Sequence, residues 1–499
     1  FITPSQADDI RDFQIEGMSI GDSLLDYFTE DKIKENSKPL IIGKKKYNQY
    51  RKFIIPLNNE QYTHASINFK AGDNKYLIKS ISGIRGTIGG KAGNNLTPLD
   101  ALKFGCAYGQ WLKKHSSNKK LNVVIGRDAR ISGEMIQNFV QNSLVSIGIN
   151  VIDIGLSTTP TVELMVTKFN ADGGIIITAS HNPTEWNALK LLDENGEFLD
   201  HKAGSEIVSI SKADDFTFSE VYDLGTIIKK KGTMNSHIES VLNLELVNQE
   251  DIKSKKLKIV VDAVNSTGGI IVPDFLKALN IEVVELYCEP NGNFPHNPEP
   301  LKKNLSELCK KVVEEKADLG IAVDPDVDRL VFVCENGEIF GEENTLVACS
   351  DYVLEKTPGS TVSNLSSSIA LRDITKKHNE VHFYCAVGEV NVVSKMKECN
   401  AVIGGEGNGG VIYPKSHYGR DAIVGIGLFL SFYIERGLSA SQLLDTYPKY
   451  YMLKEKINLS TEINVDKILN QIAEKYKSDK VDLIDGVRID FNESWVQLR

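Results

Sequence analysis

GGIIITASHNP, residues 173–183, joins an apolar run to a polar turn. The apolar run predicts a strand, and open α/β sheets bind their ligands beyond the carboxyl ends of such strands. Ser180, His181 and Asn182 in this turn offer a place for a nucleophile. A helix cap fits the same residues, because Ser and Asn cap helices and Pro often opens them. A Ser–His hydrolase dyad fits less well, since a general base normally comes from elsewhere in the fold.

Outward from this turn the sequence alternates between strand and helix patterns. The alternation predicts an α/β fold with parallel or mixed sheets that helices cover on both faces. A basic run at Lys229–Lys231 predicts a linker between two such blocks. The apolar segment Ile423–Phe432 is about half a membrane span and predicts a buried helix. The apolar runs that predict strands lie at 122–125, 151–154, 174–178, 257–261, 282–286 and 319–323.

Residues 1–75 follow a different pattern. A helix is expected at Gly21–Asn36, and short strands are expected at 52–56 and 66–70. No chemistry is evident here, so we predict a small N-terminal appendage of unknown role.

Composition and charge narrow the classes of partner. A chain of 499 residues predicts about three or four domains. Its formal net charge of −10 argues against nucleic acid and against an acidic membrane, so an anionic substrate would need a local basic cluster. Seven widely spaced cysteines without a CxxC pair argue against zinc and disulfides. Reduced thiols, no signal peptide and a cytoplasmic location are expected.

A second polar cluster, Asp324-Pro-Asp326-Val-Asp328-Arg329, follows the apolar run 319–323. Three carboxylates on alternate positions of an extended loop point to one side, where they repel one another unless a cation neutralises them. Oxygen ligands of this kind select Mg²⁺ or Ca²⁺ over zinc. An EF-hand does not fit, because Arg329 stands where its sharp turn needs glycine. A solvated acidic loop is the alternative.

A third cluster, GGEGNGG at 404–410, follows the apolar residues 401–403. Its glycines permit close approach of the backbone to a ligand. Glu406 and Asn408 supply hydrogen bonds suited to sugar hydroxyls. The cluster matches neither a dinucleotide fingerprint nor a P-loop, and a flexible turn would have the same composition.

Three arginines give a weaker indication of a phosphate-binding site. Arginines lie among glycines near predicted turns, where their guanidinium groups bind phosphate or carboxylate, or form surface ion pairs. They are Arg85, Arg127 and Arg130.

In this order the three clusters resemble the phosphoserine, metal and sugar-recognition loops of the α-D-phosphohexomutase superfamily, which includes phosphoglucomutases, phosphomannomutases and phosphoglucosamine mutases. The resemblance runs from Lys79 to the end of the chain. It implies three related mixed α/β domains, with the phosphoserine loop in 76–225, the metal loop in 226–340 and the sugar loop in 341–447. A smaller TATA-box-protein-like α+β domain is implied at 448–499. The family's phosphate-binding loop should begin at Arg499, so we expect this domain to be truncated.

The resemblance also implies a mechanism. Phosphorylated Ser180 donates its phosphoryl group to a sugar 1- or 6-phosphate, and the resulting hexose 1,6-bisphosphate reorients and returns the other phosphate. Asp324, Asp326 and Asp328, with a phosphoserine oxygen, would hold one Mg²⁺ that offsets the charge of the transferring group. The other implied catalytic roles are proton transfer and charge stabilisation for Arg85 and Lys190, and support of the phosphoserine for His181, together with Arg329. The residues expected to bind substrate are Glu406, Asn408, Gly410, Arg329 and Arg499. We expect Arg127 and Arg130 to be supporting residues.

Departures from the family's pattern bear on the sugar. Asn408 replaces the usual Ser, Gly410 stands where many members have His, and Glu389 stands where some mannose and glucose mutases carry a sugar-contacting His. Phosphoglucosamine mutases tolerate such loops, so we expect glucosamine phosphate ahead of mannose and glucose phosphates.

Two alternatives lie outside the mutases. One is a non-catalytic phosphosugar-binding protein, and the other is a metal-dependent phosphatase that hydrolyses phosphorylated Ser180. In each case the partner is a small phosphosugar, with no nucleic acid or membrane, and the protein is a monomer or a homodimer.

Overall fold

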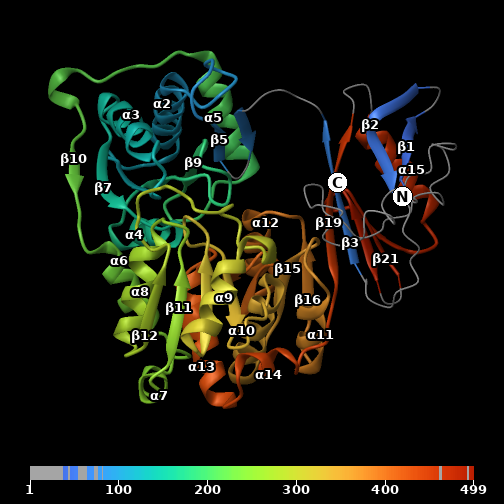
Figure 1. The fold of residues 1–499 in the computed structure, drawn as a ribbon. Helices are drawn as coiled ribbons and strands as arrows, with labels where there is room; N and C mark the ends of the chain where they lie inside the picture. The colour runs from blue at the N-terminus through green and yellow to red at the C-terminus, as the bar shows by residue number, and fades with distance from the viewer. Residues whose placement is uncertain are drawn as a thin grey trace. The chain divides into compact units, whose positions relative to one another are not determined.

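The computed structural model describes residues 37–42, 45–53, 64–71, 77–80, 83–459, 464–491 and 494–499. Contacts within the chain divide it into two units, residues 75–447 and residues 1–74 together with 448–499. The predicted helix at Gly21–Asn36 lies outside the described residues. The larger unit consists of three successive α/β domains (Figure 1).

The first domain is built on a seven-stranded sheet. Its elements are β4 (Leu77–Ser80), β5 (Gly83–Thr87), α2 (Pro98–His115), β6 (Asn122–Arg127), α3 (Gly133–Ser146), β7 (Asn150–Leu156), α4 (Thr159–Lys168), β8 (Gly173–Ile177), β9 (Trp186–Leu192), α5 (His201–Ala213), η3 (Val221–Asp223) and β10 (Ile227–Lys229). The strand order is β10-β7-β6-β8-β9-β5-β4, and β10 to β8 run parallel. Every residue of β8 is buried, as expected for a central strand with helices on both faces.

The second and third domains have smaller sheets. The second contains α6 (Thr233–Leu242), α7 (Gln249–Ser254), β11 (Lys258–Asp262), α8 (Gly268–Ala278), β12 (Glu282–Leu286), η4 (Lys302–Asn304), α9 (Ser306–Glu315), β13 (Leu319–Val323) and β14 (Leu330–Cys334). The third contains α10 (Glu342–Lys356), β15 (Thr361–Asn364), α11 (Ala370–Lys377), β16 (His382–Cys385), α12 (Glu389–Cys399), β17 (Ile403–Glu406), β18 (Gly410–Ile412), α13 (Ala422–Arg436) and α14 (Ala440–Leu444).

One four-stranded pattern occurs in all three domains. It is β7-β6-β8-β9 in the first, β12-β11-β13-β14 in the second and β16-β15-β17-β18 in the third. Each time the earliest strand lies second in the order, and the last strand is antiparallel to its neighbour. Each of the three polar clusters connects the third strand of this pattern to the fourth. The three loops therefore occupy equivalent positions in related domains.

Helix α13 joins the second and third domains. Residues 422–433 are all buried, which confirms the buried helix predicted at Ile423–Phe432. The helix contacts α6 and α7 on one side and α10 on the other. Its Phe429 ring stacks on Phe332 of β14 with ring centroids 3.8 Å apart. Among the helices that the structure describes, none combines the length and apolar character that a membrane crossing requires.

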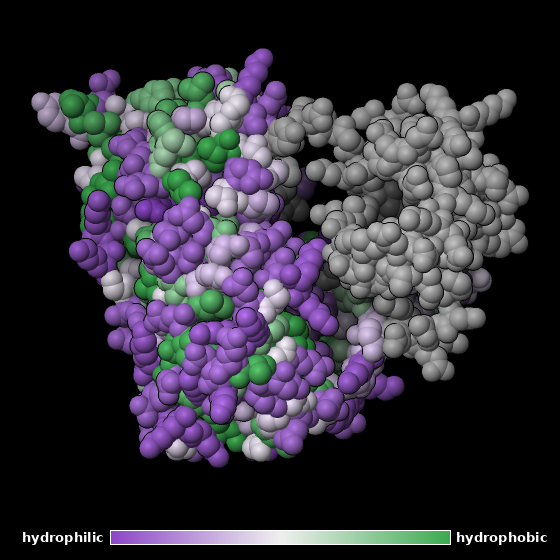
Figure 2. Space-filling view, viewed as in Figure 1, coloured by the Kyte–Doolittle hydropathy of each residue, from purple (hydrophilic) through white to green (hydrophobic). Residues whose placement is uncertain are grey.

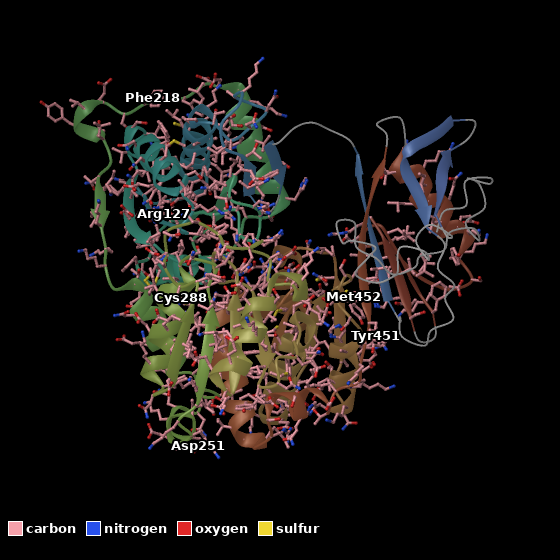
Figure 3. All side chains as sticks on the ribbon, in the orientation of Figure 1. Arg127, Phe218, Asp251, Cys288, Tyr451 and Met452 are labelled. Atoms are coloured by element: carbon pink, nitrogen blue, oxygen red, sulfur yellow. The ribbon has the colours of Figure 1, made fainter. Side chains whose placement is uncertain are left out.

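The connection from α5 to β10 runs along the outside of the first domain. Phe218, Val221 and Tyr222 are exposed there, with Tyr222 at 97%. Figure 3 labels Phe218 on this connection. Figure 2 shows apolar residues at the same corner of an otherwise largely hydrophilic face. These exposed side chains lie outside the three loop clusters.

The smaller unit contains a five-stranded sheet in the order β19-β3-β22-β21-β20. Its elements are β3 (His64–Ala71), β19 (Met452–Leu459), α15 (Val465–Lys475), β20 (Lys480–Asp482), β21 (Val487–Asp490) and β22 (Trp495–Leu498), with β1 (Ser37–Ile42) and β2 (Lys45–Phe53) as a separate pair. Strand β3 pairs in parallel with both β19 and β22. Residues from the expected N-terminal appendage thus contribute a strand to the sheet of residues 448–499.

Candidate active site

Ser180 lies in the loop between β8 and β9 and is nearly fully buried. Its φ of 49° is in the left-handed region, which costs energy for a residue other than glycine and is typical of functional sites. The Ser180 hydroxyl donates a 2.6 Å hydrogen bond to Oδ2 of Asp324 in the second domain. The loop leads into a strand, so the helix-cap interpretation is wrong.

Arg130 organises the backbone of this loop. Its Nε pairs with Asp128 at 3.0 Å. Its two terminal nitrogens donate to four backbone carbonyls, those of Ser180, Asn182, Pro183 and Trp186. All five donors of the guanidinium are therefore used within the protein. Arg130 holds the serine loop in place.

The aspartates of the second cluster, Asp324, Asp326 and Asp328, are all 0% exposed. One carboxylate oxygen of each lies within 4.8 Å of the others, so the three can hold a metal ion. Oδ1 of Asp326 and Oδ1 of Asp328 find no hydrogen-bond partner within the described part of the chain. Buried carboxylate oxygens are costly when unpaired, so the set fits a cation that prefers oxygen ligands. The interpretation as a solvated acidic loop is wrong.

All three domains hold this aspartate loop through its backbone. The carbonyl of Pro325 accepts from the Thr267 hydroxyl in the second domain. The next two carbonyls accept from the N–H groups of Thr159 in the first domain and Ala422 in the third. Val327, at φ 63°, adopts a conformation that is rare for a β-branched residue. The loop is a rigid centre on which the domains converge.

Lys190 on β9 provides a buried positive charge beside the aspartates. Its ammonium donates to Oδ2 of Asp326 at 2.6 Å and to Oδ2 of Asp328 at 3.3 Å. Burial alone would lower the pKa of Lys190, but the charges of the two aspartates outweigh burial and raise it. Lys190 is therefore charged at neutral pH.

Charge is compensated unevenly around the aspartate loop. Burial, followed by the charges of Asp328 and Asp326, raises the pKa of Asp324 well above its ordinary value. Burial would act in the same direction on Asp328, but Arg420, Lys190 and Arg329 hold the pKa of Asp328 below its usual range. Repulsion between the carboxylates thus concentrates at Asp324, next to Ser180.

Arg85 and His181 lie beside the serine. The Arg85 guanidinium donates to Oδ1 of Asn182 at 2.7 Å, and burial lowers the pKa of Arg85 to about 10, which leaves it charged at neutral pH. His181 Nδ1 lies 3.4 Å from the Ser180 Oγ. Burial, then the charges of Arg329 and Arg85, lowers the pKa of His181 well below its ordinary value, so its imidazole is neutral.

Glu406 at the end of β17 is the buried carboxylate of the third cluster, at 5% exposure. Oε1 accepts from the Asn364 amide at 2.6 Å, and Oε2 accepts from Arg420 at 2.7 Å. Burial would raise the pKa of Glu406, but the charge of Arg420 outweighs it and lowers the pKa. Asn408 Oδ1 accepts from the N–H of Gly410 at 3.2 Å, which shapes the loop. Glu406 is thus an ionised and firmly oriented acceptor.

Arg420 was missed by the sequence analysis. Its guanidinium lies between three buried carboxylates, with hydrogen bonds of 2.7 Å to Asp328, 2.7 Å to Glu406 and 3.0 Å to Glu389. Both carboxylate oxygens of Glu389 bond Arg420, because Oε1 also accepts from the backbone N–H of Arg420 at 2.8 Å. The only local signal was an Arg–Asp pair before an apolar helix, and no spacing rule connects it to aspartates 92 positions earlier.

The remaining predicted site residues are Arg127, Arg329 and Arg499. Arg127 bonds the Asp128 carbonyl and lies 3.9 Å from Glu134; Figure 3 labels it at the side of the first domain that faces the second. The backbone N–H of Arg329 donates to Oδ1 of Asp324 at 3.1 Å, and its guanidinium lies 3.9 Å from Oδ1 of Asp328 and 3.4 Å from Glu299. Arg499 belongs to the smaller unit, where it pairs with Asp485 at 3.3 Å.

Comparison with known proteins gives a consistent result. Family models of α/β/α domains I, II and III of phosphoglucomutase/phosphomannomutase match residues 78–218, 235–337 and 342–450. The chain is 37% identical over 420 residues to a phosphoglucomutase/phosphomannomutase of Thermococcus kodakarensis, covering 83% of this chain and 91% of the relative. It is 32% identical over 423 residues to a probable phosphoglucosamine mutase of Methanopyrus kandleri, covering 84% and 90%.

A solved structure agrees with these relatives. A phosphoglucomutase/phosphomannomutase family protein from Burkholderia thailandensis superposes with a TM-score of 0.71 at 25% identity, covering 84% of this chain and 90% of that one. The fold and the matched domains define a phosphosugar mutase enzyme. The chain belongs to the α-D-phosphohexomutase superfamily, as predicted, and its relatives carry the names of both phosphoglucomutase/phosphomannomutase and phosphoglucosamine mutase.

Proposed function

We propose that this enzyme interconverts the 6-phosphate and 1-phosphate of glucosamine through phosphorylated Ser180 and a 1,6-bisphosphate. The observation that carries the proposal is the hydrogen bond from the Ser180 hydroxyl to Asp324, a member of a buried set of three carboxylates. Phosphoryl transfer needs a nucleophile beside a site that concentrates positive charge. Ser180 meets this requirement.

Asp324, Asp326 and Asp328 would hold one Mg²⁺, together with an oxygen of the phosphorylated serine. The unpartnered Oδ1 atoms among the described residues support this assignment. When bound, the ion supplies positive charge that offsets the negative charge of the transferring phosphoryl group.

In the first transfer, the free hydroxyl of the sugar monophosphate attacks the phosphorus on Ser180. The new P–O bond forms as the bond from phosphorus to Oγ breaks, and the hydroxyl proton ends on Oγ. Lys190, which is buried, and Arg85, which is half-buried, are the cations on the neighbouring strands that would stabilise the charge and assist this proton transfer. After the bisphosphate turns round, the Ser180 Oγ attacks the phosphorus of its other phosphate; the bond from this phosphorus to the sugar oxygen breaks, and the serine proton ends on that oxygen. The bond from Ser180 to Asp324 corresponds to the enzyme between these two transfers.

The charge of the sugar loop supports glucosamine. Glu406 is an ionised member of the loop that the family uses for the sugar. Its partner Arg420 is shared with Asp328 and Glu389, so the three carboxylates outnumber this arginine, and Asn408 and Gly410 add no positive charge. A negative sugar site favours the ammonium group at C2 of glucosamine over a neutral hydroxyl. The name of the Methanopyrus relative supports the same choice.

A substrate panel tests the proposal. Glucosamine, N-acetylglucosamine, mannose and glucose 6-phosphates are compared with catalytic amounts of the matching 1,6-bisphosphate and Mg²⁺. The proposal expects the highest kcat/KM for glucosamine 6-phosphate. Faster turnover of mannose or glucose phosphate would reassign the sugar. Release of inorganic phosphate without isomer would indicate a phosphatase, and binding without any conversion would indicate a phosphosugar-binding protein.

A further inference from the structure

We propose that Arg420 is a positioning residue that presents Asp328 to the metal through a single oxygen and thereby favours Mg²⁺ over Ca²⁺. This role rests on the proposed metal site. It concerns a residue outside the three loops, contributed by the segment that leads into α13.

The hydrogen bonds of the aspartates divide their oxygens into two kinds. Oδ2 of Asp328 accepts from Arg420 at 2.7 Å and from Lys190 at 3.3 Å. Oδ2 of Asp326 accepts from Lys190 at 2.6 Å and from the Thr159 hydroxyl at 2.5 Å. In both residues Oδ1 stays without a hydrogen-bond partner in the described structure. Each carboxylate therefore offers one oxygen and has the other already held.

Arg420 is itself fixed at both ends. At its base, the backbone N–H donates to Glu389, and the following residue, Asp421, caps α13 through two hydrogen bonds. Asp421 also accepts from the buried His237 of the second domain at 2.8 Å. At the tip, the guanidinium is shared among Asp328, Glu389 and Glu406. Its position cannot relax without breaking a buried ion pair, which is a costly change.

Gly410 provides the space that Arg420 needs. A Cβ atom at Gly410 would lie 2.3 Å from Cδ of Arg420, which is far inside van der Waals contact. A side chain at this position, where many family members have His, would displace the arginine. The observed position of the Arg420 side chain therefore requires glycine at position 410.

The preference follows from the geometry that each ion accepts. Mg²⁺ requires near-ideal octahedral geometry, whereas Ca²⁺ takes six to eight oxygens and readily binds both oxygens of one carboxylate. Holding Oδ2 of Asp328 on Arg420 denies this second oxygen to an ion. Without Arg420, Oδ2 of Asp328 would keep only the longer 3.3 Å hydrogen bond from Lys190. That weaker hold would allow bidentate binding and favour the larger ion.

Calorimetric titration of the metal-free full chain with Mg²⁺ alone and Ca²⁺ alone tests the proposal. No sugar or turnover is involved, so the result is independent of the mutase assay. We expect wild type to bind Mg²⁺ more tightly than Ca²⁺. In Arg420→Met, the ratio of the Ca²⁺ to the Mg²⁺ dissociation constant should fall by about tenfold, because only Ca²⁺ gains the second oxygen. Loss of a nearby positive charge strengthens both ions alike and cancels in the ratio.

Three further variants make the test specific. Arg420→Lys retains one charge but cannot bridge the carboxylates, and Gly410→Ala displaces an unchanged Arg420; both should shift the ratio in the same direction. Arg436→Met, the same change at an arginine paired with Glu355 at the far end of α13, should keep the wild-type ratio. If Arg420→Met does not fold, the other two active-site variants decide. An unchanged ratio in the folded variants, or a wild type that binds neither ion or prefers Ca²⁺, overturns the proposal.

Discussion

The hydroxyl of Ser180 donates a 2.6 Å hydrogen bond to Asp324, which lies 144 positions further along the chain. The two residues occupy equivalent loops of the first and second domains, each after the third strand of the same four-stranded pattern. The contact between these two domains therefore brings Ser180, the proposed nucleophile, next to the aspartates.

Asp326→Asn should cut mutase activity by about a hundredfold or more and weaken Mg²⁺ binding, because a neutral amide replaces a charged group that we propose as a metal ligand. Activity as a function of Mg²⁺ concentration, together with calorimetry, measures both effects. The exposed Asp274→Asn on α8 is the control and should behave as wild type. Mutase activity that is indifferent to EDTA would count against the metal assignment.

Glu406→Gln should lower kcat/KM by about tenfold while the enzyme still becomes phosphorylated on Ser180. The reason is that the proposal gives Glu406 the role of orienting the sugar and no part in the phosphoryl step; a tenfold change corresponds to about 1.4 kcal/mol. Steady-state kinetics and intact mass separate the two effects, with the exposed Glu398→Gln as control. Loss of the phosphoserine in Glu406→Gln would show that the division of roles is wrong.

Arg130→Met should destabilise the protein by about 3–5 kcal/mol, since it leaves Asp128 as an uncompensated buried charge and frees four loop carbonyls. Arg127→Met, at a less buried arginine beside it, should cost less than about 1 kcal/mol. Urea unfolding followed by circular dichroism measures the difference. Equal losses in the two variants would contradict the role given to Arg130.

The unfolding free energy should fall as pH rises towards 10. Burial would lower the pKa of His417, but hydrogen bonds to Asp421 and Glu163 raise it from 6.5 to about 10. A raised histidine pKa means that the folded state holds the proton more tightly. The associated stability is complete below pH 6.5 and is lost as the pH passes through about 10. Glu163, whose pKa burial raises to about 8, acts in the same direction over a lower range.

His417→Gln tests this dependence. The decline in the urea midpoint between pH 8 and pH 10 should be shallower in the variant than in wild type. Titration of unfolded lysine and tyrosine is common to both proteins and cancels in the comparison. His201→Gln on α5, at an exposed histidine, should retain the wild-type slope. Identical slopes for His417→Gln and wild type would exclude His417 as the source.

Local patterns predicted the elements and the loops well. The strands expected at 282–286 and 319–323 have those bounds in the structure. The three clusters were visible because each consists of neighbouring residues that follow an apolar strand. The linker predicted at Lys229–Lys231 overlaps β10, whose last residue is Lys229.

Pairings between distant segments could not be predicted in this way. Arg420 reaches Asp328 only because two domains dock, and β3 joins β19 only because of the sheet order. The solvated loop was an open alternative for the aspartates because the sequence does not show that three domains close over this loop and leave Asp326 fully buried. The domain boundaries at 225/226, 340/341 and 447/448 and the individual catalytic roles stay predictions.

The most direct test of the proposed mechanism is the intact mass of the enzyme after incubation with glucosamine 1,6-bisphosphate and Mg²⁺. The account predicts one added phosphate, mapped by peptide analysis to Ser180 and lost on addition of excess glucosamine 6-phosphate. Ser180→Ala should remain unmodified and retain less than about 1% of mutase activity, a loss of about 2.7 kcal/mol in transition-state stabilisation. The exposed Ser205→Ala should behave as wild type. A phosphate on another residue, or an active Ser180→Ala enzyme, would contradict the central claim.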